Sequence, residues 1–299
     1  MTEKLTSEVS IGIIGGSGLY EIEGFSRVEE IAVSTPFGKP SDTYIVGELN
    51  GTRVAFLPRH GRKHLWLPSE LNYRANIYGF KSLGISHIIA ITAVGSLQED
   101  RAPLDMVIPD QLIDRTRQRQ SSFFGQGIAA HIPFSVPFCP ALSQLLYDTA
   151  KTIVGRVHKG GTLVTIEGPA FSTKAESRLF REWNCDIIGM TTYQEAKLSR
   201  EAEICYAALA MVTDYDCWKD ASSEEVTVET VVANLKKNSS NAQKIITNVL
   251  PEISNRRSCL CPDSLQGAIM TNPDSINPNI RKKLALLIED RVSSMIKQD

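Results

Sequence analysis

The sequence lacks an excess of charge of either sign, since 32 Lys and Arg residues are set against 34 Asp and Glu residues. The basic residues are also spread evenly along the chain rather than gathered in one block. Proteins that bind nucleic acid or an anionic membrane surface normally carry a basic patch or stripe. We therefore expect neither nucleic acid nor a membrane among the partners.

Long apolar runs are also absent, and none approaches the roughly 20 residues of a transmembrane helix. The first ten residues are polar, and the glycine-rich apolar run at 11–16 is too short for the apolar region of a signal peptide. We therefore expect a cytoplasmic protein.

Cysteine is too sparse for a disulfide framework, with six residues in a chain of 299. Cys259 and Cys261 form a C-x-C pair, and the other four stand alone in apolar or helical surroundings where we expect core positions: Cys139, Cys185, Cys205 and Cys217. His60 and His64 are four residues apart, but Gly61 disfavours a helix that would present both to a metal, and no third ligand is visible. We therefore expect no metal.

What the sequence does contain is a set of apolar strands that end in polar residues. The run at 207–212 has no charge and predicts a strand buried on both faces. Ligands bind beyond the carboxyl ends of such strands, and Asp214 and Asp216 follow there. If the chain stays extended past Thr213, both carboxylates project from one side. One of two such close carboxylates is a candidate proton carrier near neutral pH; the alternative is a surface turn with two solvated acids.

Three further strand ends carry candidates for an oxyanion site. The glycine-rich turn at 15–18 either permits a tight turn or presents backbone N–H groups to an anion, with the Ser17 hydroxyl added. Arg59 and His60 follow a strand at 53–57 and suit phosphate, although a solvated basic loop is the alternative. Thr92 and Ala93, late in a strand at 87–96, would place a hydroxyl and backbone amides at the same sheet edge.

Two other segments qualify as functional candidates. Phe171 and Ser172 lie on a strand-to-helix turn, where the aromatic ring either stacks on a flat base or joins the core. The loop at 123–138, which contains His131, is long enough to indicate a functional or interface role.

Alternating strands and helices predict a single α/β domain whose mixed, mostly parallel sheet is flanked by helices. We expect strands at 31–34, 43–48, 53–57, 87–96, 106–113, 162–169 and 186–190, before the strand at 207–212. Helices are expected at 68–82, 142–154, from 173, from 191 to 203, at 227–249 and at 279–297. The domain is expected to span 1–255, followed by a linker with the C-x-C pair at 256–278 and a helical extension at 279–299.

A phosphate site beside a site for a nitrogen heterocycle suggests a nucleoside or nucleotide, with binding or catalysis both open. Seven motifs in order then resemble one family, the S-methyl-5′-thioadenosine phosphorylases, a trimer-forming branch of the purine nucleoside phosphorylase superfamily. They are IGIIGGSG at 11–18, FLPRHGR at 56–62, NYRAN at 72–76, AVGSL at 93–97, IEGP with FS at 166–172, IGMT at 188–191 and TDYDCW at 213–218.

The resemblance covers residues 10–250 and implies a purine nucleoside phosphorylase-like fold. It implies reversible phosphorolysis of S-methyl-5′-thioadenosine to adenine and 5-methylthioribose 1-phosphate, in purine and methionine salvage. Inorganic phosphate is then a co-substrate, no metal or organic cofactor takes part, and the assembly is a homotrimer or a dimer of trimers.

The same resemblance assigns roles by position. Asp214 is the implied acid that delivers a proton to N7 of the purine, and an aspartate there suits a 6-aminopurine. The implied phosphate site consists of Ser17, Arg59, His60, Thr92, Ala93 and Thr191. The implied nucleoside site consists of Asp214, Asp216, Phe171 and Ser172 at the base, Met190 beneath the ribose, Val228, Val231 and Val232 at the methylthio group, and His131 from a neighbouring subunit.

The sequence departs from the family at Ala170, where Arg is usual, and at Tyr193 and Gln194, where Val-Pro is usual. The C-x-C pair resembles one that closes as a disulfide in heat-adapted members, but a bridge between residues two apart is strained, so we expect free thiols. The alternative activities are a 6-oxopurine or methylthioinosine phosphorylase, a calcium-dependent nucleoside hydrolase that uses both aspartates, and a nucleotide-binding protein without catalysis.

Overall fold

Strand β5 (His87–Ser96) is the centre of the sheet in the computed structural model, which describes residues 10–16, 24–219, 228–253 and 257–296. Strand β1 (Ile11–Gly15) runs parallel along one edge of β5, and β11 (Cys205–Asp214) runs parallel along the other. Nearly all residues of these three strands are buried. Helices cover both faces of the sheet, which is why the strands are almost continuously apolar.

The other strands extend the sheet on both sides of this centre. Strands β4 (Thr52–Pro58), β3 (Tyr44–Leu49) and β2 (Ser26–Ile31) follow β1 in that order. On the other side are β10 (Ile187–Gly189), β9 (Thr162–Ile166) and β7 (Gln111–Arg115). Strand β11 also pairs with β6 (Met106–Ile108), which pairs with β8 (Val157–Lys159). The sheet is therefore mixed and mostly parallel, as predicted.

The sheet branches along β5. Strand β1 pairs with β5 only as far as Ile91, and β10 takes over the same edge at Gly95 and Ser96. Between these two partners, residues 92–94 of β5 pair with β11 alone among the described strands. The branch therefore opens one side of β5 at the point where the parallel strands β1 and β4 end.

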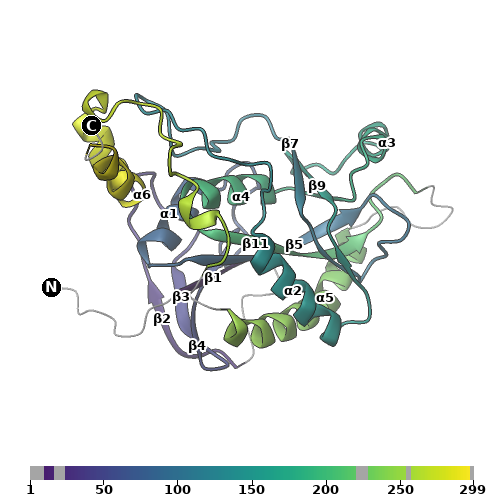
Figure 1. Cartoon of the computed structure of the whole chain (residues 1–299). Coiled ribbons are helices and arrows are strands. Elements are labelled where there is room, and N and C mark those ends of the chain that lie inside the picture. The colour runs from purple at the N-terminus through teal and green to yellow at the C-terminus, as the bar shows by residue number, and fades with distance from the viewer. Residues whose placement is uncertain (1–9, 17–23, 220–227, 254–256, 297–299) are drawn as a thin grey trace.

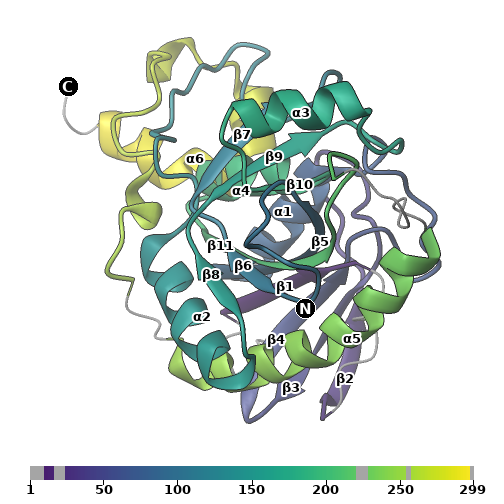
Figure 2. The ribbon, with the colours of Figure 1, turned by 90° about the vertical axis from the view of Figure 1, so that its right-hand side faces the viewer.

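Helices form one layer on each face (Figures 1 and 2). One face carries α1 (Tyr73–Ser82), α4 (Thr192–Glu201) and α6 (Pro278–Ile296). The other carries α2 (Pro140–Ile153) and α5 (Val228–Val249), which lie side by side. Successive side chains of a strand point to opposite faces. Ile88 and Ala90 of β5 therefore pack in the first layer, and Ile89 and Ile91 pack in the second.

Helix α3 (Lys174–Glu182) begins with a capping box, at the position where a helix is expected. The Thr173 hydroxyl accepts a hydrogen bond from the Glu176 backbone, and the Glu176 carboxylate accepts one from the Thr173 backbone. This cap ends the strand-to-helix turn that contains Phe171.

Two strand predictions are wrong. The strand expected at 31–34 lies earlier, as β2. The strand expected at 106–113 is two strands, because Pro109 has no N–H for a ladder and separates β6 from β7. The two halves then join different neighbours: β6 pairs with β11 and β8, and β7 pairs with β9.

The segment between α5 and α6 lies against the domain. It includes the short 3-10 helices η1 (Leu250–Glu252), η2 (Cys261–Asp263) and η3 (Pro273–Ser275). Leu265 and Ile269 are buried, and Leu284 and Ile288 of α6 belong to the same core as α1 and α4. The domain boundary at residue 255 stays a prediction.

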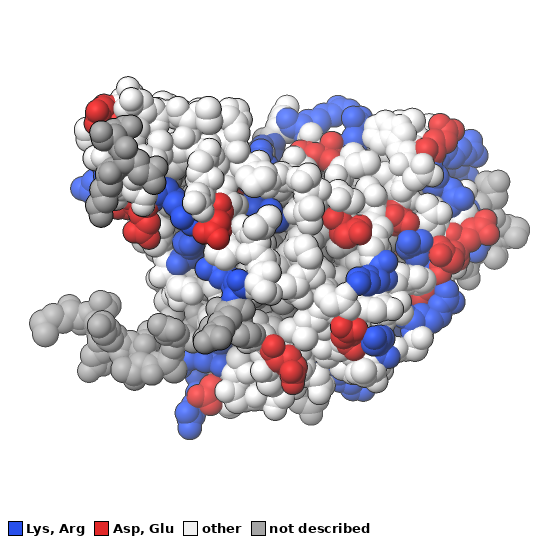
Figure 3. Space-filling view, viewed as in Figure 1, with Lys and Arg blue, Asp and Glu red and all other residues white. Residues whose placement is uncertain are grey.

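Basic and acidic side chains are interspersed on the face shown in Figure 3. Among the described residues, no helix has both the length and the apolar composition needed to cross a membrane.

Candidate active site

A cavity of about 330 Å³ lies at the branch of the sheet. This volume is within the range of small-molecule sites. It is lined by most residues predicted for the site: Arg59, His60, Thr92, Ala93, Phe171, Ser172, Met190, Thr191, Asp214 and Asp216. The candidate oxyanion residues and the two aspartates therefore share one cavity.

Strand register explains why the oxyanion candidates meet. Gly15 of β1 is opposite both Pro58 of β4 and Ile91 of β5. Gly16 and Arg59, the residues that follow these two strand ends, therefore leave the sheet beside Thr92, which continues in β5. A Cβ atom at Gly16 would lie 3.9 Å from both Arg59 Nη1 and His60 Cδ2, so glycine leaves room beside these two side chains.

Arg59 is only 2% exposed, and its hydrogen bonds hold the guanidinium group in a fixed orientation. Its Nε and Nη2 donate to the two carboxylate oxygens of Glu195 in α4, which is fully buried. Nη1 donates to the carbonyl of Ile91 (2.9 Å), and Nη2 also lies 3.4 Å from that of Ile14. These contacts use four of the five guanidinium N–H groups and leave one on Nη1 for a ligand.

Burial by itself would lower the pKa of Arg59, and the ion pair with Glu195 reverses this and raises it. The guanidinium therefore keeps its charge next to the cavity. Removal of either partner would leave an unpaired charge in the interior and would strongly destabilise the fold.

His60 enters the cavity as a neutral imidazole. Its Nδ1 is 2.8 Å from the carbonyl oxygen of Trp66, so Nδ1 carries the proton and donates. Burial lowers the pKa of His60 to about 4, with a further contribution from the Arg59 charge. Nε2 is then a hydrogen-bond acceptor at neutral pH, which suits the P–OH group of monohydrogen phosphate.

Two hydroxyl groups complete this end of the cavity. Thr92 stands on the unpaired edge of β5 and is buried. Thr191 is the N-cap residue of α4 but makes no side-chain capping bond, so its hydroxyl is available to a ligand. The N-terminus of a helix favours an anion, and α4 begins at the cavity wall.

The two aspartates form the other end. Strand β11 ends at Asp214, and the chain turns at Asp216, which has a positive φ of 51°. The expected extended continuation is therefore wrong. The carboxylates are neighbours because the Asp216 backbone N–H donates to Asp214 Oδ1 (2.8 Å).

Burial raises the pKa of both aspartates. The hydroxyl of Thr213 lies 2.7 Å from Asp214 Oδ2 and 3.1 Å from the carbonyl of Val94, but it has one proton. When Asp214 is ionised, this hydroxyl donates to Oδ2; when Asp214 is protonated, it accepts from Oδ2 and donates to Val94. Thr213 therefore stabilises both protonation states of Asp214.

The cavity wall at this end also holds polar atoms that lack partners among the described residues. Ser172 Oγ is buried and makes no hydrogen bond there, and Asp216 Oδ2 has no partner at hydrogen-bonding geometry, although the nearby Ser177 side chain acts to lower the Asp216 pKa. Leaving such groups unpaired is costly. They suit a ligand that brings hydrogen-bonding groups of its own.

Phe171 is 53% exposed and lines the cavity, so it is not a core residue. Met190 immediately precedes Thr191 in the chain and also lines the cavity. An exposed aromatic ring beside unpaired polar atoms suits a planar heterocycle.

Other predicted residues do not line the cavity. His131 is exposed on the long loop, where its backbone N–H donates to the carbonyl of Ala268. Val232 of α5 is 44% exposed and is not part of the wall, whereas Leu235 of the same helix is. Ser17 lies outside the described residues, as do the side chains of Val228 and Val231.

Sequence reasoning missed Glu195 and Arg119. The Arg119 side chain is almost fully buried and donates to Glu167 Oε1 (2.9 Å) and the hydroxyl of Tyr73 (3.0 Å). It also donates to the carbonyl of Met190, which fixes the backbone beside Thr191. A buried arginine and a buried glutamate each need a partner, but the sequence shows neither that these two side chains are buried nor which residues pair with them.

The departure at Gln194 belongs to this network. Gln194 is buried, accepts from Arg119 (3.2 Å) and donates to the Thr116 hydroxyl (2.8 Å). Ala170 is exposed on the turn. Gln194 therefore helps to hold Arg119, whose Nη1 also donates to the carbonyl of the cavity residue Met190.

The arrangement can hold an anion at one end and places carboxyl groups with a raised pKa at the other. Among the described residues, the one cluster of three or more potential metal ligands is formed by cysteines, none of which lines this cavity. Proton transfer and charge stabilisation are thus the chemistry that these side chains offer.

Residues 10–251 match the family model of the phosphorylase superfamily. Curated relatives include the S-methyl-5′-thioadenosine phosphorylase of Koribacter versatilis, which is 52% identical over 94% of this chain and 96% of its own. That of a Synechocystis species is 54% identical over 93% of this chain and 86% of its own.

Solved structures that are similar to this chain also include methylthioadenosine phosphorylases. A methylthioadenosine phosphorylase from an Antarctic soil metagenomic library is 45% identical, with a TM-score of 0.89 over 94% of this chain and 99% of its own. The enzyme from Schistosoma mansoni in complex with adenine is 36% identical, with a TM-score of 0.79 over 94% and 98%. A variant of that enzyme is in complex with methylthioadenosine.

Proposed function

Because this chain belongs to the S-methyl-5′-thioadenosine phosphorylase family of the phosphorylase superfamily, we propose that it catalyses reversible phosphorolysis of S-methyl-5′-thioadenosine. The products are adenine and 5-methylthioribose 1-phosphate. The observation that carries this proposal is the shared cavity, with a buried cation and neutral imidazole at one end and the carboxyl groups of the half-buried Asp214 and the buried Asp216 at the other.

Phosphate binds where the strand ends converge. The free N–H of Arg59 and the hydroxyls of Thr92 and Thr191 donate to its oxygens, and His60 Nε2 accepts from its P–OH group. The N-terminus of α4 adds a favourable dipole. Ala93 contributes backbone at the unpaired edge, and Ser17 remains assigned to this site by position in the family.

The base occupies the other end. Phe171 covers one face of the purine, and Ser172 and Asp216 Oδ2 gain the partners that they lack in the described chain. The 6-amino group of adenine is a donor and suits these carboxylates, whereas a 6-oxo group would present an acceptor. Met190 lies beneath the ribose, and the valines of α5 (Val228, Val231 and Val232) remain assigned to the methylthio group.

The reaction breaks the bond between N9 and C1′ and forms a bond between C1′ and a phosphate oxygen. Positive charge grows on the ribose and is stabilised by the phosphate dianion, and negative charge grows on the purine. Asp214 donates its proton to N7, and monohydrogen phosphate gives up one proton, so the protons balance. The general acid contributes about 10²–10⁴ in rate. These steps need no metal or organic cofactor.

We further propose a homotrimer or a dimer of trimers in the cytoplasm, in which the exposed His131 completes a neighbouring subunit's site. Trp66 and Leu67 are also exposed at the cavity wall, as an interface there would require. Light scattering and a His131→Ala variant test this, because a monomer with unchanged KM for the nucleoside would contradict it.

The activity is tested by measuring adenine release from S-methyl-5′-thioadenosine with and without phosphate. We expect release only with phosphate, and unchanged release after a chelator is added. Phosphate-independent release that a chelator abolishes would instead indicate a calcium-dependent hydrolase. Faster turnover of inosine or methylthioinosine would indicate a 6-oxopurine enzyme, and tight adenine binding without product would indicate a binding protein.

A further inference from the structure

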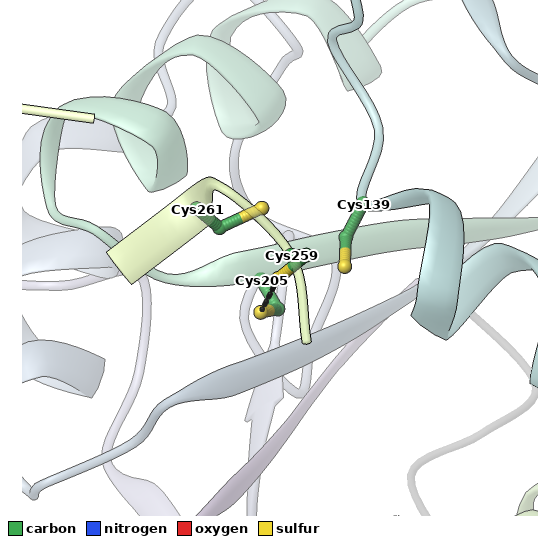
Figure 4. A group of neighbouring side chains, drawn as sticks. All are labelled: Cys139, Cys205, Cys259 and Cys261. Carbon is green, nitrogen blue, oxygen red and sulfur yellow. Dashed lines mark hydrogen bonds between the residues drawn. The ribbon is translucent and has the colours of Figure 1, made fainter. Parts of the chain in front are cut away.

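Four of the six cysteines meet at one point. Cys139 and Cys205 occupy core positions, as predicted, and lie there beside two other cysteines. Their sulfur atoms and those of Cys259 and Cys261 all lie within 4.8 Å of one another (Figure 4). All six cysteines are free in the structure, and the redox state expected for the C-x-C pair stays a prediction. We name this group the four-cysteine cluster.

The cluster joins three parts of the chain. Cys139 is the N-cap residue of α2, Cys205 begins β11, and Cys259 and Cys261 flank the start of η2. The backbone supports this placement, because the Cys139 N–H donates to the carbonyl of Tyr206 (2.8 Å) in β11. Three of the four cysteines therefore stand at the start of a helix or strand, and Cys259 lies two residues before Cys261.

The sulfur spacing suits a tetrahedral site. A zinc–thiolate bond of about 2.3 Å places sulfur atoms ~3.8 Å apart at the corners of a tetrahedron. In the cluster, Cys205 Sγ is 3.3 Å from Cys259 Sγ, and the other separations are at most 4.8 Å. A disulfide needs a sulfur separation of about 2.05 Å, which no pair has.

Burial and charge also suit a bound cation. Cys139, Cys205 and Cys261 are almost fully buried, while Cys259 is partly exposed and provides an entry path. A zinc ion with four thiolates carries a charge of −2. The charge of the buried Arg200 acts on Cys261. The α2 N-terminus at Cys139 adds a positive dipole.

We propose that the four-cysteine cluster is a structural zinc site. Zinc displaces one proton from each thiol and changes no oxidation state. All four positions are filled by protein, as in structural rather than catalytic sites. The ion fastens the segment before α6 to α2 and β11, on the amino-terminal side of β11 and away from the cavity at its carboxyl end. This site differs from the expectation of no metal.

The first experiment is a titration of the reduced full-length protein with zinc against a chromophoric chelator. We expect one high-affinity zinc per chain. The double variant Cys259→Ser/Cys261→Ser should lose this binding. Cys185→Ser is the matched control, because Cys185 is buried but outside the cluster, and it should bind zinc as the wild type does.

Binding of cobalt(II) to the wild-type protein tests the site without relying on whether the variants fold. Cobalt bound to the wild type should give thiolate charge-transfer bands and the intense visible bands of tetrahedral coordination. A strong chelator should lower the melting temperature of the wild type and of Cys185→Ser, but not that of the double variant. The KM for S-methyl-5′-thioadenosine should stay unchanged, since no cluster residue lines the cavity.

Two results would overturn the proposal. One is failure of the reduced wild type to bind zinc or tetrahedral cobalt. The other is an intact mass, after alkylation of the unreduced and metal-stripped protein, that shows two alkylated thiols fewer than six; this result would assign the cluster to a disulfide instead.

Discussion

The Arg59–Glu195 ion pair allows a prediction that joins stability to phosphate binding. Glu195→Gln keeps the shape of the side chain but removes the charge that balances a guanidinium only 2% exposed. The amide can accept through one oxygen, whereas the carboxylate accepts from Arg59 through both oxygens and from the Tyr206 hydroxyl (2.9 Å). The variant therefore leaves a buried cation incompletely paired.

Removing one partner of a buried pair costs about 3–5 kcal/mol, and we expect the lower end because Gln keeps one acceptor. For a chain of this size, a loss of 3 kcal/mol lowers the melting temperature by roughly 6 °C or more. Arg59 also loses its fixed orientation. We therefore expect the phosphate KM to rise about tenfold, equivalent to about 1.4 kcal/mol, with a smaller change in the nucleoside KM.

The assays are thermal unfolding and initial rates of adenine release at varied phosphate and saturating nucleoside. Glu289→Gln is the matched control, because it removes a carboxylate from the exposed ion pair with Arg281 and should leave both readouts unchanged. The reasoning is refuted if Glu195→Gln unfolds and binds phosphate as the wild type and this control do.

Three further predictions concern the cavity. Asp214→Asn should lower kcat by about 10²–10⁴ with little change in melting temperature or phosphate KM, and stopped-flow or steady-state rates would contradict the acid role if kcat is unchanged. Burial raises the pKa of Asp214 and Asp216. Their contribution to the free energy of unfolding is therefore fully present below pH 3.8 and is lost as the pH rises through the raised pKa values. The kcat falls over the same range, because Asp214 loses the proton that it donates. A pH–rate profile should therefore fall on the alkaline side in the wild type and flatten in Asp214→Asn; an identical profile would be inconsistent with this. Phe171→Ala should raise the nucleoside KM about fivefold through lost stacking worth about 1 kcal/mol and leave the phosphate KM alone, which initial-rate measurements at varied nucleoside can disprove.

The sequence predicts the centre of the sheet because β5 and β11 are buried on both faces and are therefore continuously apolar. It also predicts Arg59, Thr92 and Asp214 as site residues, because each stands at or near a strand end where parallel strands align. These features follow from local composition and from the general placement of ligands in α/β sheets.

Features that depend on pairing over long distances are not visible in the sequence. Arg59 and Glu195 are 136 residues apart, and nothing local shows that they are partners. The antiparallel joining of β10 to β5 forms the branch of the sheet and depends on which neighbours are available, whereas the break at Pro109 is a local feature that the sequence does contain. The four-cysteine cluster was missed for the same reason, since its members come from three separate segments.

The central claim is that phosphate and a proton-donating carboxyl group act on one glycosidic bond from opposite ends. A crystal structure with S-methyl-5′-thioadenosine and sulfate, which resembles phosphate but does not react, tests this most directly. The account predicts sulfate within hydrogen-bonding distance of Arg59, His60 and Thr191, and purine N7 within reach of Asp214. Sulfate bound on another surface, or a purine turned away from Asp214, would contradict it.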